Sequence, residues 1–510
     1  MLVHHFLETS AQKTPKGKAV WELNQWKTYG QIEAMANRTA NFLIEQGFQK
    51  GDRVALLYEN SSDYIISYYA ILKAGAIVVS INIGYTSEML AYVLINSEVK
   101  AMISQKIFSS KVLPAIQKSP FIKVSIVHQD DLLKFREVGH CDVYSLQTIY
   151  EDGSSINPDC SIIDVDIASI VYTSGSTGRP KGVTLTHLNI VSNTKSIVSY
   201  LQLTAKDRIM VVLPFYYIYG KSLLNTHFYV GGSVVIDNRF TYPAVILNTM
   251  KDTEVTGFAG VPSTFIILIN KSPIQEYQFD HLRYVTQAGG AMAIPIQKKV
   301  VDLFAPAQLY IMYGATEASA RLSYLEPSML PRKWGSIGKA IPNVELEIVD
   351  QTGKPVPPET EGEIAARGAN IMTGYWQDPL ETQKVLKNGL YYTGDLGKKD
   401  KDGYFYVVGR KKDMIKVGGE RISPKEIEEQ LLEINEIHEV AAIGVPDPVL
   451  GEAIQIFIVP RARVNMTEND LLIIIKKKLP IYMHPKTIVI IKNIPKNESG
   501  KIMKTQLMTS

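Results

Sequence analysis

The chain has 510 residues, of which 54 are Lys or Arg and 51 are Asp or Glu, so its net charge at pH 7 is only +3. A chain this close to neutral has no overall electrostatic attraction to DNA, RNA or an anionic membrane, and we expect no nucleic-acid partner. Its two cysteines, Cys141 and Cys160, are too few for a disulfide framework or a four-thiolate zinc site.

The N-terminus lacks the basic segment followed by an apolar run that marks a signal peptide. The most apolar window, residues 64–84, is interrupted by Lys73, so we expect no transmembrane segment. Hydrophobic residues make up 45% of the chain, which at this length is enough for a large core. These observations predict a globular, cytoplasmic protein.

Short apolar runs alternate with stretches of helical periodicity along most of the chain, which is typical of βα units around parallel sheets. Helices are expected over residues 36–46 and 62–74. Buried strands are expected over residues 53–57, 168–172, 208–213, 233–236, 283–287 and 309–312. We therefore predict an α/β fold class, with βα-layered subdomains in a large N-terminal domain.

A smaller unit follows a strand at 404–408 and a polar break at 409–413. Ser423 to Glu426 has the pattern of a capping box with Pro at the first helical position, which predicts a helix over 424–433. The remaining predicted elements are strands over 440–445 and 454–459, a helix over 468–479 and a strand over 487–491. We predict an N-terminal domain over 1–409, a hinge at 410–412 and a small α+β C-terminal domain over 413–510.

A candidate phosphate-binding loop follows the apolar run 170–172. The segment Thr173 to Gly182 is rich in Gly, Ser and Thr and contains two cations, Arg179 and Lys181. Glycines let the backbone approach a phosphate closely, hydroxyl and amide groups donate to its oxygens, and Lys offsets its charge. The spacing is neither that of a Walker loop nor that of a nucleophile elbow.

Residues 172–182 strongly resemble the signature loop of the adenylate-forming enzymes, which include acyl-CoA synthetases, the adenylation domains of peptide synthetases, and luciferases. Further motifs recur in the order of that family, so the resemblance covers essentially the whole chain. It implies a ligase that uses ATP and Mg²⁺ to convert a carboxylic acid and a thiol into a thioester.

The second signature that the resemblance identifies is Tyr313 to Glu317. It implies that Tyr313 stacks on adenine, that Thr316 contacts the α-phosphate and that Glu317 helps to hold Mg²⁺, a role suited to a hard oxygen ligand. Asp395 matches the ribose-binding carboxylate, and Arg410 the arginine that also reaches ribose or phosphate. The implied ATP- and AMP-binding residues are Thr173, Ser174, Gly175, Ser176, Thr177, Gly178, Lys181, Gly289, Gly290, Ala291, Tyr313, Gly314, Ala315, Thr316, Asp395 and Arg410.

The C-terminal part carries the remaining motifs. Lys501 matches the catalytic lysine of the family, and the resemblance implies that it acts with Thr316 and Glu317 during adenylation. Lys412 occupies the hinge position about which a mobile C-terminal domain turns between the two steps. Gly418, Gly419 and Glu420 resemble the loop of the tunnel through which the thiol reaches the acyl-adenylate.

The acyl pocket is expected to be lined by Tyr217, Tyr219, Leu223, Gly290 and Gly314. Many family members carry His near Tyr217, so no histidine role is carried over there. Amino-acid-activating members carry an Asp in this segment, and its absence disfavours a cationic amine. Acetate-specific members carry Trp at the position of Gly314, so an open pocket floor predicts a medium-to-long-chain or aromatic acid.

Lys221 follows the aromatic run of the pocket segment. We expect it to face solvent at the start of a helix, with contact to a polar or acidic substrate tail as the alternative. The predicted thiol acceptor is coenzyme A, and the phosphopantetheine arm of an acyl carrier protein is the close alternative. A luciferase-like oxygenase is a remote alternative, and the sequence leaves the oligomeric state open.

Overall fold

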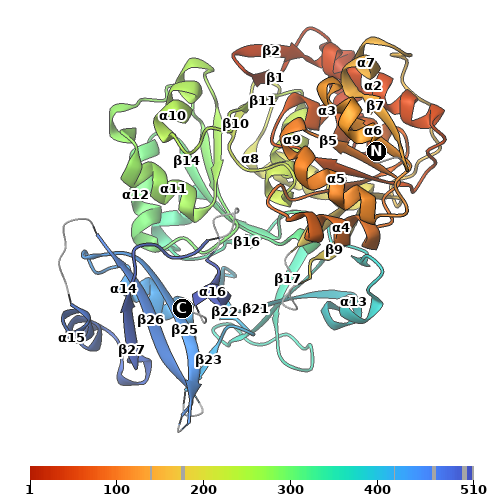
Figure 1. Ribbon diagram of the computed structural model, residues 1–510. Coiled ribbons are helices and arrows are strands. Elements are labelled where there is room, and N and C mark those ends of the chain that lie inside the picture. Colours follow the sequence, from red (N-terminus) through yellow and green to blue (C-terminus); the bar gives the residue numbers. More distant parts are fainter. Residues whose placement is uncertain are drawn as a thin grey trace.

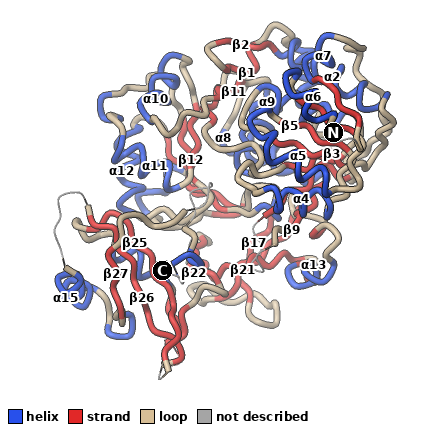
Figure 2. The backbone as a smooth tube through the Cα atoms, in the orientation of Figure 1, coloured by secondary structure: helices blue, strands red, loops and turns tan. Residues whose placement is uncertain are grey.

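The computed structural model describes residues 1–137, 140–173, 179–417, 420–448, 450–461, 467–496 and 502–507. Four β-sheets organise this part of the chain, and helices cover the two largest sheets on both faces (Figure 1). The fourth sheet, formed by strands between Ile415 and Ile490, lies with its helices at the lower left of the view, apart from the two large sheets (Figure 2).

The first sheet has the strand order β16-β15-β14-β13-β12-β10-β11-β1-β2. Its central strands β10 to β14 are parallel, so their carboxyl ends meet at one edge. Its strands are β1 (Lys18–Glu22), β2 (Gln25–Thr28), β10 (Arg208–Val211), β11 (Ser233–Ile236), β12 (Gly257–Gly260), β13 (Tyr284–Gln287), β14 (Gln308–Tyr313), β15 (Ser323–Leu325) and β16 (Lys339–Ala340). The helices near it are α1 (His5–Lys13), α2 (Tyr29–Glu45), α8 (His187–Leu201), α9 (Ile218–Val230), α10 (Pro243–Asp252), α11 (Pro262–Lys271) and α12 (Ile294–Phe304).

The second sheet has the order β19-β9-β8-β4-β3-β5-β6-β7 and is parallel from β8 to β7. Its strands are β3 (Arg53–Leu57), β4 (Ile77–Ser80), β5 (Ala101–Ser104), β6 (Val124–Val127), β7 (Asp142–Ser145), β8 (Ile167–Thr173), β9 (Lys181–Thr186) and β19 (Gly374–Tyr375). Its helices are α3 (Ser62–Lys73), α4 (Ser87–Asn96), α5 (Ser109–Lys118), α6 (Leu132–Arg136) and α7 (Leu146–Glu151).

These two sheets share one core. Buried residues of both sheets and of the helices between them form a single cluster, which includes Val54 of β3, Tyr64 of α3, Ile197 of α8, Leu224 of α9 and Val234 of β11. The outer faces are covered separately, the first sheet by α10, α11 and α12 and the second by α4 and α5. Burial on both faces explains why these parallel strands read as short, continuous apolar runs in the sequence.

The third sheet has the order β17-β18-β21-β20, and β22 pairs with β21. Its elements are β17 (Val344–Val349), β18 (Gly362–Gly368), α13 (Pro379–Val385), β20 (Leu386–Lys387), β21 (Leu390–Lys399) and β22 (Phe405–Arg410). All of its pairings are antiparallel.

The fourth sheet has the order β24-β23-β26-β25, with β27 beside β26. Its elements are β23 (Ile415–Val417), β24 (Glu420–Ile422), α14 (Pro424–Leu431), β25 (Ile437–Asp447), β26 (Gly451–Pro460), α15 (Glu468–Lys478), β27 (Thr487–Ile490) and α16 (Lys504–Leu507). Its main core cluster, among the described residues, contains only residues from Ile415 onward. Two of its residues bond to β22: Ser423 Oγ donates to the Val408 carbonyl at 2.6 Å, and Lys425 Nζ donates to the Val407 carbonyl at 2.5 Å, as seen in the described part of the chain.

Most predicted elements occur within a few residues of their expected bounds, and the differences have local causes. The helix expected over 36–46 is α2 and begins at Tyr29, because Thr28 and Gln31 form a capping box at its start. At Ser423 only half of the expected box is present: its Oγ accepts from the Glu426 N–H at 3.4 Å while donating to β22. No helix in the described part of the chain has both the length and the apolar character needed to cross a bilayer.

Candidate active site

Three side chains join the end of β14 to the third sheet. Tyr313, the last residue of β14, donates its hydroxyl to Asp395 Oδ2 at 2.6 Å. Arg410 Nε donates to Asp395 Oδ1 at 2.8 Å, and these two residues are direct cross-strand partners on β21 and β22. Burial, together with the Asp395 carboxylate, raises the pKa of Tyr313 well above its ordinary value, so its hydroxyl stays a donor.

Glu317 lies in the short turn after β14, and its carboxylate is oriented by a residue that sequence reasoning missed. Tyr375 of β19 donates its hydroxyl to Glu317 Oε1 at 2.8 Å. The Met372 N–H donates to the Glu317 carbonyl at 2.8 Å. Burial, with the nearby Glu317, raises the pKa of Tyr375. The predicted metal-binding carboxylate is therefore held by a neutral phenol.

The strand ends that flank the phosphate loop lie side by side. Thr173 ends β8, Lys181 begins β9, and the two are antiparallel partners. The predicted loop residues Ser174, Gly175, Ser176, Thr177 and Gly178 lie outside the described residues. Lys181 forms an ion pair with Glu381 of α13, and its Nζ lies 5.3 Å from the centre of the Tyr375 ring.

The segment after β13 is exposed and has a defined backbone. Gly289 has a φ of +82°, in the left-handed region that favours glycine. The Gln287 side chain donates to the Gly290 carbonyl at 2.8 Å and so holds this turn. Gly289, Gly290 and Ala291 thus lie at the carboxyl end of β13, on the edge of the sheet from which Tyr313 to Glu317 leave β14.

Only some of the site residues predicted in the C-terminal part lie within the described part of the chain. Lys501, Gly418 and Gly419 lie outside the described residues, whereas the backbone of Glu420 begins β24 and pairs with Val417. Lys412 is exposed in a turn in which the Asp413 N–H donates to the Arg410 carbonyl at 3.0 Å. Its predicted hinge role remains a prediction.

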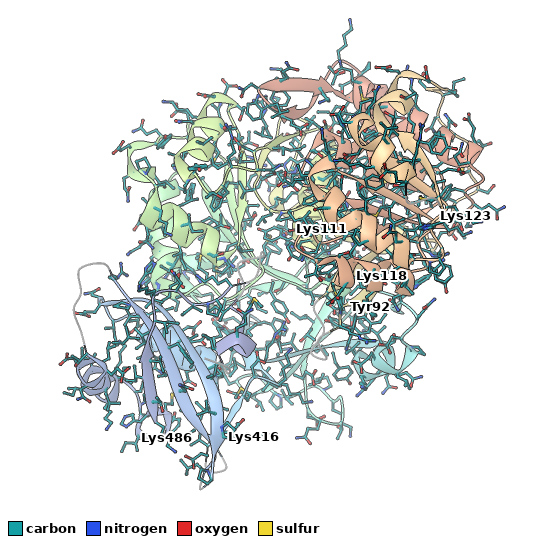
Figure 3. All side chains as sticks on the ribbon, viewed as in Figure 1. Tyr92, Lys111, Lys118, Lys123, Lys416 and Lys486 are labelled. Carbon is teal, nitrogen blue, oxygen red and sulfur yellow. The ribbon has the colours of Figure 1, made fainter. Side chains whose placement is uncertain are left out.

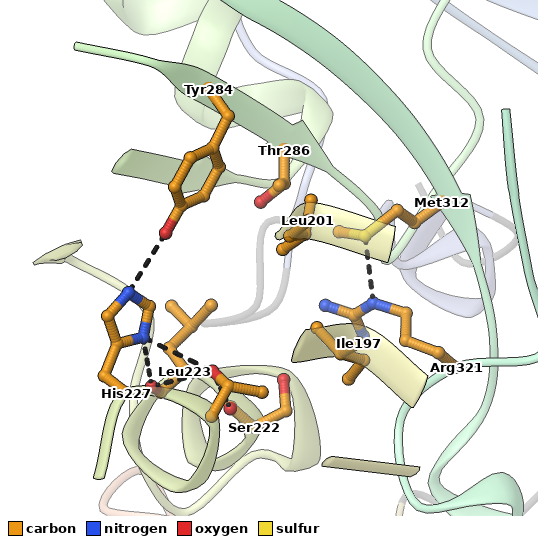
Figure 4. A pocket seen from close by; sticks show the side chains of 10 residues that line it. Ile197, Leu201, Ser222, Leu223, His227, Tyr284, Thr286, Met312 and Arg321 are labelled. Atoms are coloured by element: carbon orange, nitrogen blue, oxygen red, sulfur yellow. Dashed lines mark hydrogen bonds between the residues drawn. The ribbon is translucent and has the colours of Figure 1, made fainter. Parts of the chain in front are cut away.

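A narrow cavity with a volume of about 10 Å³, room for about one water molecule, lies between α8, α9, β13 and β14 (Figure 4). It is lined by Ile197, Leu201, Ser222, Leu223, Thr226, His227, Tyr284, Thr286, Met312 and Arg321. Of the predicted pocket residues, Leu223 lines it, and Tyr219 adjoins it with its hydroxyl 2.9 Å from Thr286 Oγ1. Tyr217 and Gly290 do not line it, and Tyr217 instead accepts from Asn82 Nδ2 at 3.1 Å.

Gly314 does not form an open pocket floor, so that expectation is wrong. A Cβ atom at this position would lie 2.0 Å from the Ala320 carbonyl oxygen and 2.8 Å from Arg321 Cα. The backbone of the following loop therefore occupies the space that a side chain would need. Glycine is required here by close backbone approach, and its presence says nothing about the length of the acid.

The expectation for Lys221 is also wrong. The residue is fully buried, because α9 is enclosed by the core from Tyr219 to Phe228. Its Nζ donates to Ser80 Oγ and lies 5.2 Å from the centre of the Tyr68 ring. Burial lowers the pKa of Lys221 to about 7. It is not among the residues that line the cavity.

The chain matches two family models. The model described as AMP-binding enzyme matches residues 7–376, and that of the AMP-binding enzyme C-terminal domain matches residues 426–501. A long-chain-fatty-acid–CoA ligase of Bacillus subtilis (strain 168) is 30% identical over 524 residues, covering 98% of this chain and 93% of that protein. An oxalate–CoA ligase of Arabidopsis thaliana is 31% identical over 507 residues, covering 98% of this chain and 96% of that protein.

Among solved structures, the o-succinylbenzoate coenzyme A synthetase of Bacillus subtilis in complex with ATP and magnesium ion superposes with a TM-score of 0.85. It is 25% identical and covers 99% of each chain. The predicted α/β fold class, with a large N-terminal part and a small C-terminal part, is thereby confirmed. This chain belongs to the AMP-binding enzymes, the adenylate-forming superfamily, and is an AMP-forming acid–thiol ligase.

Proposed function

We propose that this enzyme activates a carboxylic acid with ATP and transfers the acyl group to coenzyme A. In the first step a carboxylate oxygen attacks the α-phosphorus of ATP, giving an acyl-adenylate and pyrophosphate. In the second step a thiolate attacks the acyl carbon, giving a thioester and AMP. The observation that carries the proposal is the joining of Tyr313 at the end of β14, Asp395 within β21 and Arg410 at the end of β22, where adenosine would bind.

The residues present fit ATP and Mg²⁺. Each Asp395 oxygen accepts one of the bonds described above, and a carboxylate has about four acceptor positions, so both ribose hydroxyls could donate to it. Glu317 accepts from Tyr375 through Oε1 and offers Oε2 as a hard ligand for Mg²⁺. When bound, Mg²⁺ would neutralise charge on the phosphates. Thr316 would contact the α-phosphate.

We also propose roles for the phosphate loop and for the predicted catalytic lysine. Residues 173–178 with Lys181 would cradle the phosphates, and Lys181 would exchange its ion pair with Glu381 for contact with them. Lys501 would supply positive charge to the in-line transition state, in which charge builds on the α-phosphate. The C-terminal domain, 413–510, would turn about the hinge at 410–412 and bring Gly418, Gly419 and Glu420 to the thiol tunnel.

The printed names of the relatives leave the acid open. Relatives at 30% and 31% identity are named for a long-chain fatty acid and for oxalate, an apolar monocarboxylate and a short dicarboxylate. The expectation of a medium-to-long-chain or aromatic acid depended on an open floor at Gly314 and loses that support. The panel of acids in the test below therefore has to identify the acid.

Coenzyme A is the proposed acceptor because the relatives and the solved structure named above are all CoA ligases or synthetases. Lys416 is exposed on β23 next to the predicted tunnel loop, and Lys486, which forms an ion pair with Asp447, lies just before β27 of the same sheet (Figure 3). Such cations suit the 3′-phosphate of coenzyme A, and they would suit an acidic carrier-protein helix as well. The carrier-protein alternative is therefore an outcome of the test.

The test measures acid-dependent pyrophosphate release with MgATP over a panel of acids, and then thioester formation from the best acid. Coenzyme A and a phosphopantetheinylated carrier protein are supplied in parallel. We expect the thioester to form faster on coenzyme A. A thioester formed only on the carrier protein would show that the carrier protein, and not coenzyme A, is the acceptor. Oxygen uptake in place of thioester would favour the luciferase-like reaction. A folded protein that releases no pyrophosphate with any acid would refute the proposal.

A further inference from the structure

Lys181, the cation at the start of β9, is held by a carboxylate that the sequence motifs do not include. Its Nζ donates to Oε2 of Glu381, a residue of α13 that lies 200 positions further along the chain. The two meet because β19, the strand before α13, pairs with β9. Both side chains are partly enclosed, with 16% and 21% of their surface exposed. Solvent therefore screens this ion pair less than it screens a pair on an open surface.

The backbone of α13 fixes the position of Glu381. Asp378, at the start of this helix, accepts from the Glu381 N–H at 3.0 Å through Oδ1, and its carbonyl accepts from the Thr382 hydroxyl at 2.7 Å. The Thr382 hydroxyl oxygen in turn accepts from the Tyr375 N–H at 2.9 Å, which ties the helix to β19. The carboxylate of Glu381 is therefore presented to Lys181 from a fixed backbone.

The ion pair lies next to the residues that would hold the nucleotide. Lys181 Nζ is 5.3 Å from the centre of the Tyr375 ring, within the range of a cation–π contact, and the hydroxyl of the same ring bonds to Glu317. In the proposed function Lys181 binds the phosphates of ATP, and Glu317 binds Mg²⁺. The ammonium that would bind ATP is thus already occupied by a carboxylate before the nucleotide arrives.

Glu381 has a second cation, which would stay with it when Lys181 leaves. Lys384, one turn further along α13, donates to Glu381 Oε1, and 68% of its side chain is exposed. Bonds from the two lysines lower the pKa of Glu381, so the carboxylate is ionised at neutral pH. Because one carboxylate charge is shared between two ammonium groups, Lys384 weakens the attraction of Glu381 for Lys181.

A carboxylate and a phosphate offer a lysine the same kind of ligand, anionic oxygens that accept from its ammonium. When the phosphates of ATP reach Lys181, they either displace Glu381 from it or share the ammonium with this second anion. Displacement breaks an ion pair, and sharing brings two negative charges together, so both lower the affinity for ATP. The charge of Glu381 therefore opposes nucleotide binding.

We propose that Glu381 regulates ATP binding: it holds Lys181 as an internal substitute for a phosphate oxygen, and the nucleotide must displace it. Glu381 is then a positioning residue that acts through Lys181 and does not touch the reacting atoms. The enzyme would keep a low affinity for the nucleotide until the ATP concentration is high enough to release this lysine. This inference rests on the proposed function and adds a control of its first step.

The experiment measures the Kd of MgATP without acid, and then KM for ATP and kcat of pyrophosphate release with the best acid of the panel at saturation. Glu381→Gln should lower Kd and KM for ATP about fivefold, the upper end for an ion pair that solvent reaches, and should leave kcat within about twofold of the wild type. Lys384→Met should raise both constants roughly twofold, because Glu381 then bonds to Lys181 alone. The double variant should match Glu381→Gln, since Lys384 acts through the carboxylate.

Asp130→Asn is the matched control, because it also replaces one ion-paired carboxylate by an amide. Asp130 accepts from Lys106 Nζ at 2.6 Å and follows β6, which three strands of the second sheet separate from β8. This variant should leave Kd and KM for ATP within about twofold of the wild type. A fivefold decrease in the control as well would assign the effect to net charge and overturn the inference.

The outcomes separate the inference from the proposed function. Unchanged or weaker ATP binding by folded Glu381→Gln would overturn the inference, and so would a lower kcat at saturating ATP, because Glu381 would then support the reaction. A double variant that differs from Glu381→Gln would overturn the role of Lys384. If Glu381→Gln does not fold, Lys384→Met decides, and unchanged or stronger ATP binding by it would overturn the inference. A wild-type enzyme that binds no ATP and releases no pyrophosphate with any acid would overturn the proposed function.

Discussion

Replacing Tyr375 by Phe removes one hydroxyl that holds the predicted metal ligand Glu317. The hydroxyl donates to Glu317 Oε1 at 2.8 Å. Phe keeps the ring that packs near Lys181 and the backbone N–H that donates to Thr382, so the change isolates this bond. A hydrogen bond to a charged group contributes about 1.5–3 kcal/mol. Because Glu317 and Tyr375 are only half-buried, we take the lower end, which corresponds to a roughly tenfold effect.

The assay is pyrophosphate release as a function of free Mg²⁺ at fixed ATP and acid. We expect Tyr375→Phe to raise the Mg²⁺ concentration for half-maximal rate about tenfold, because the carboxylate loses its fixed orientation. Tyr404→Phe is the control, since Tyr404 donates to Glu326 Oε1 at the same 2.8 Å but away from these motifs. It should change stability and not Mg²⁺ dependence. An Mg²⁺ dependence equal to that of the wild type in folded Tyr375→Phe would refute the positioning of Glu317 by this bond.

Four further outcomes are expected. Glu317→Gln should slow acid-dependent pyrophosphate release by about 10²–10³, the cost of one preorganised electrostatic group, with an unchanged unfolding midpoint; a wild-type rate would end the assignment. Lys501→Ala should lose pyrophosphate release yet convert supplied acyl-adenylate into thioester, whereas Lys412→Pro should make acyl-adenylate in one turnover and stall, because Pro fixes φ at the pivot. Equal loss of both steps in each variant would mean that one domain arrangement serves the whole reaction. Gly314→Ala should lower the free energy of unfolding by about 1–3 kcal/mol, since its Cβ would meet the next loop at 2.0 Å; denaturant melts that coincide with the wild type would contradict this. Burial lowers the pKa of His227 to about 4 from 6.5, so its contribution to stability is present above pH 6.5 and is lost as pH falls towards 4. His227→Gln should therefore reduce the loss of unfolding free energy between pH 7 and pH 5. An equal loss in the variant and the wild type would exclude His227 as its source.

The sequence predicted the parts of the fold that depend on local pattern. The runs at 53–57 and 233–236 are β3 and β11 with the same bounds, because a strand buried on both faces needs a short apolar run and little else. Gly289 to Ala291 and Tyr313 to Glu317 were identified by their resemblance to family motifs, and both segments lie at the carboxyl edge of the first sheet. That resemblance was sufficient to find them.

What the sequence did not predict depends on tertiary contacts. Lys221 has the pattern of a solvent-facing lysine, and only the enclosure of α9 by two sheets buries it. Tyr375 is 58 residues from Glu317, with which it forms a hydrogen bond.

The contact between Gly314 and the Ala320 carbonyl makes residues 314–321 one packing unit. A side chain at 314 requires the loop that ends in Arg321 to move. Substitutions at 314 and within 318–321 should therefore be strongly non-additive in their effect on stability, with each single change worse than the pair. Engineering of this enzyme should exchange residues 314–321 together, because a library that varies single positions would lose the compatible combinations.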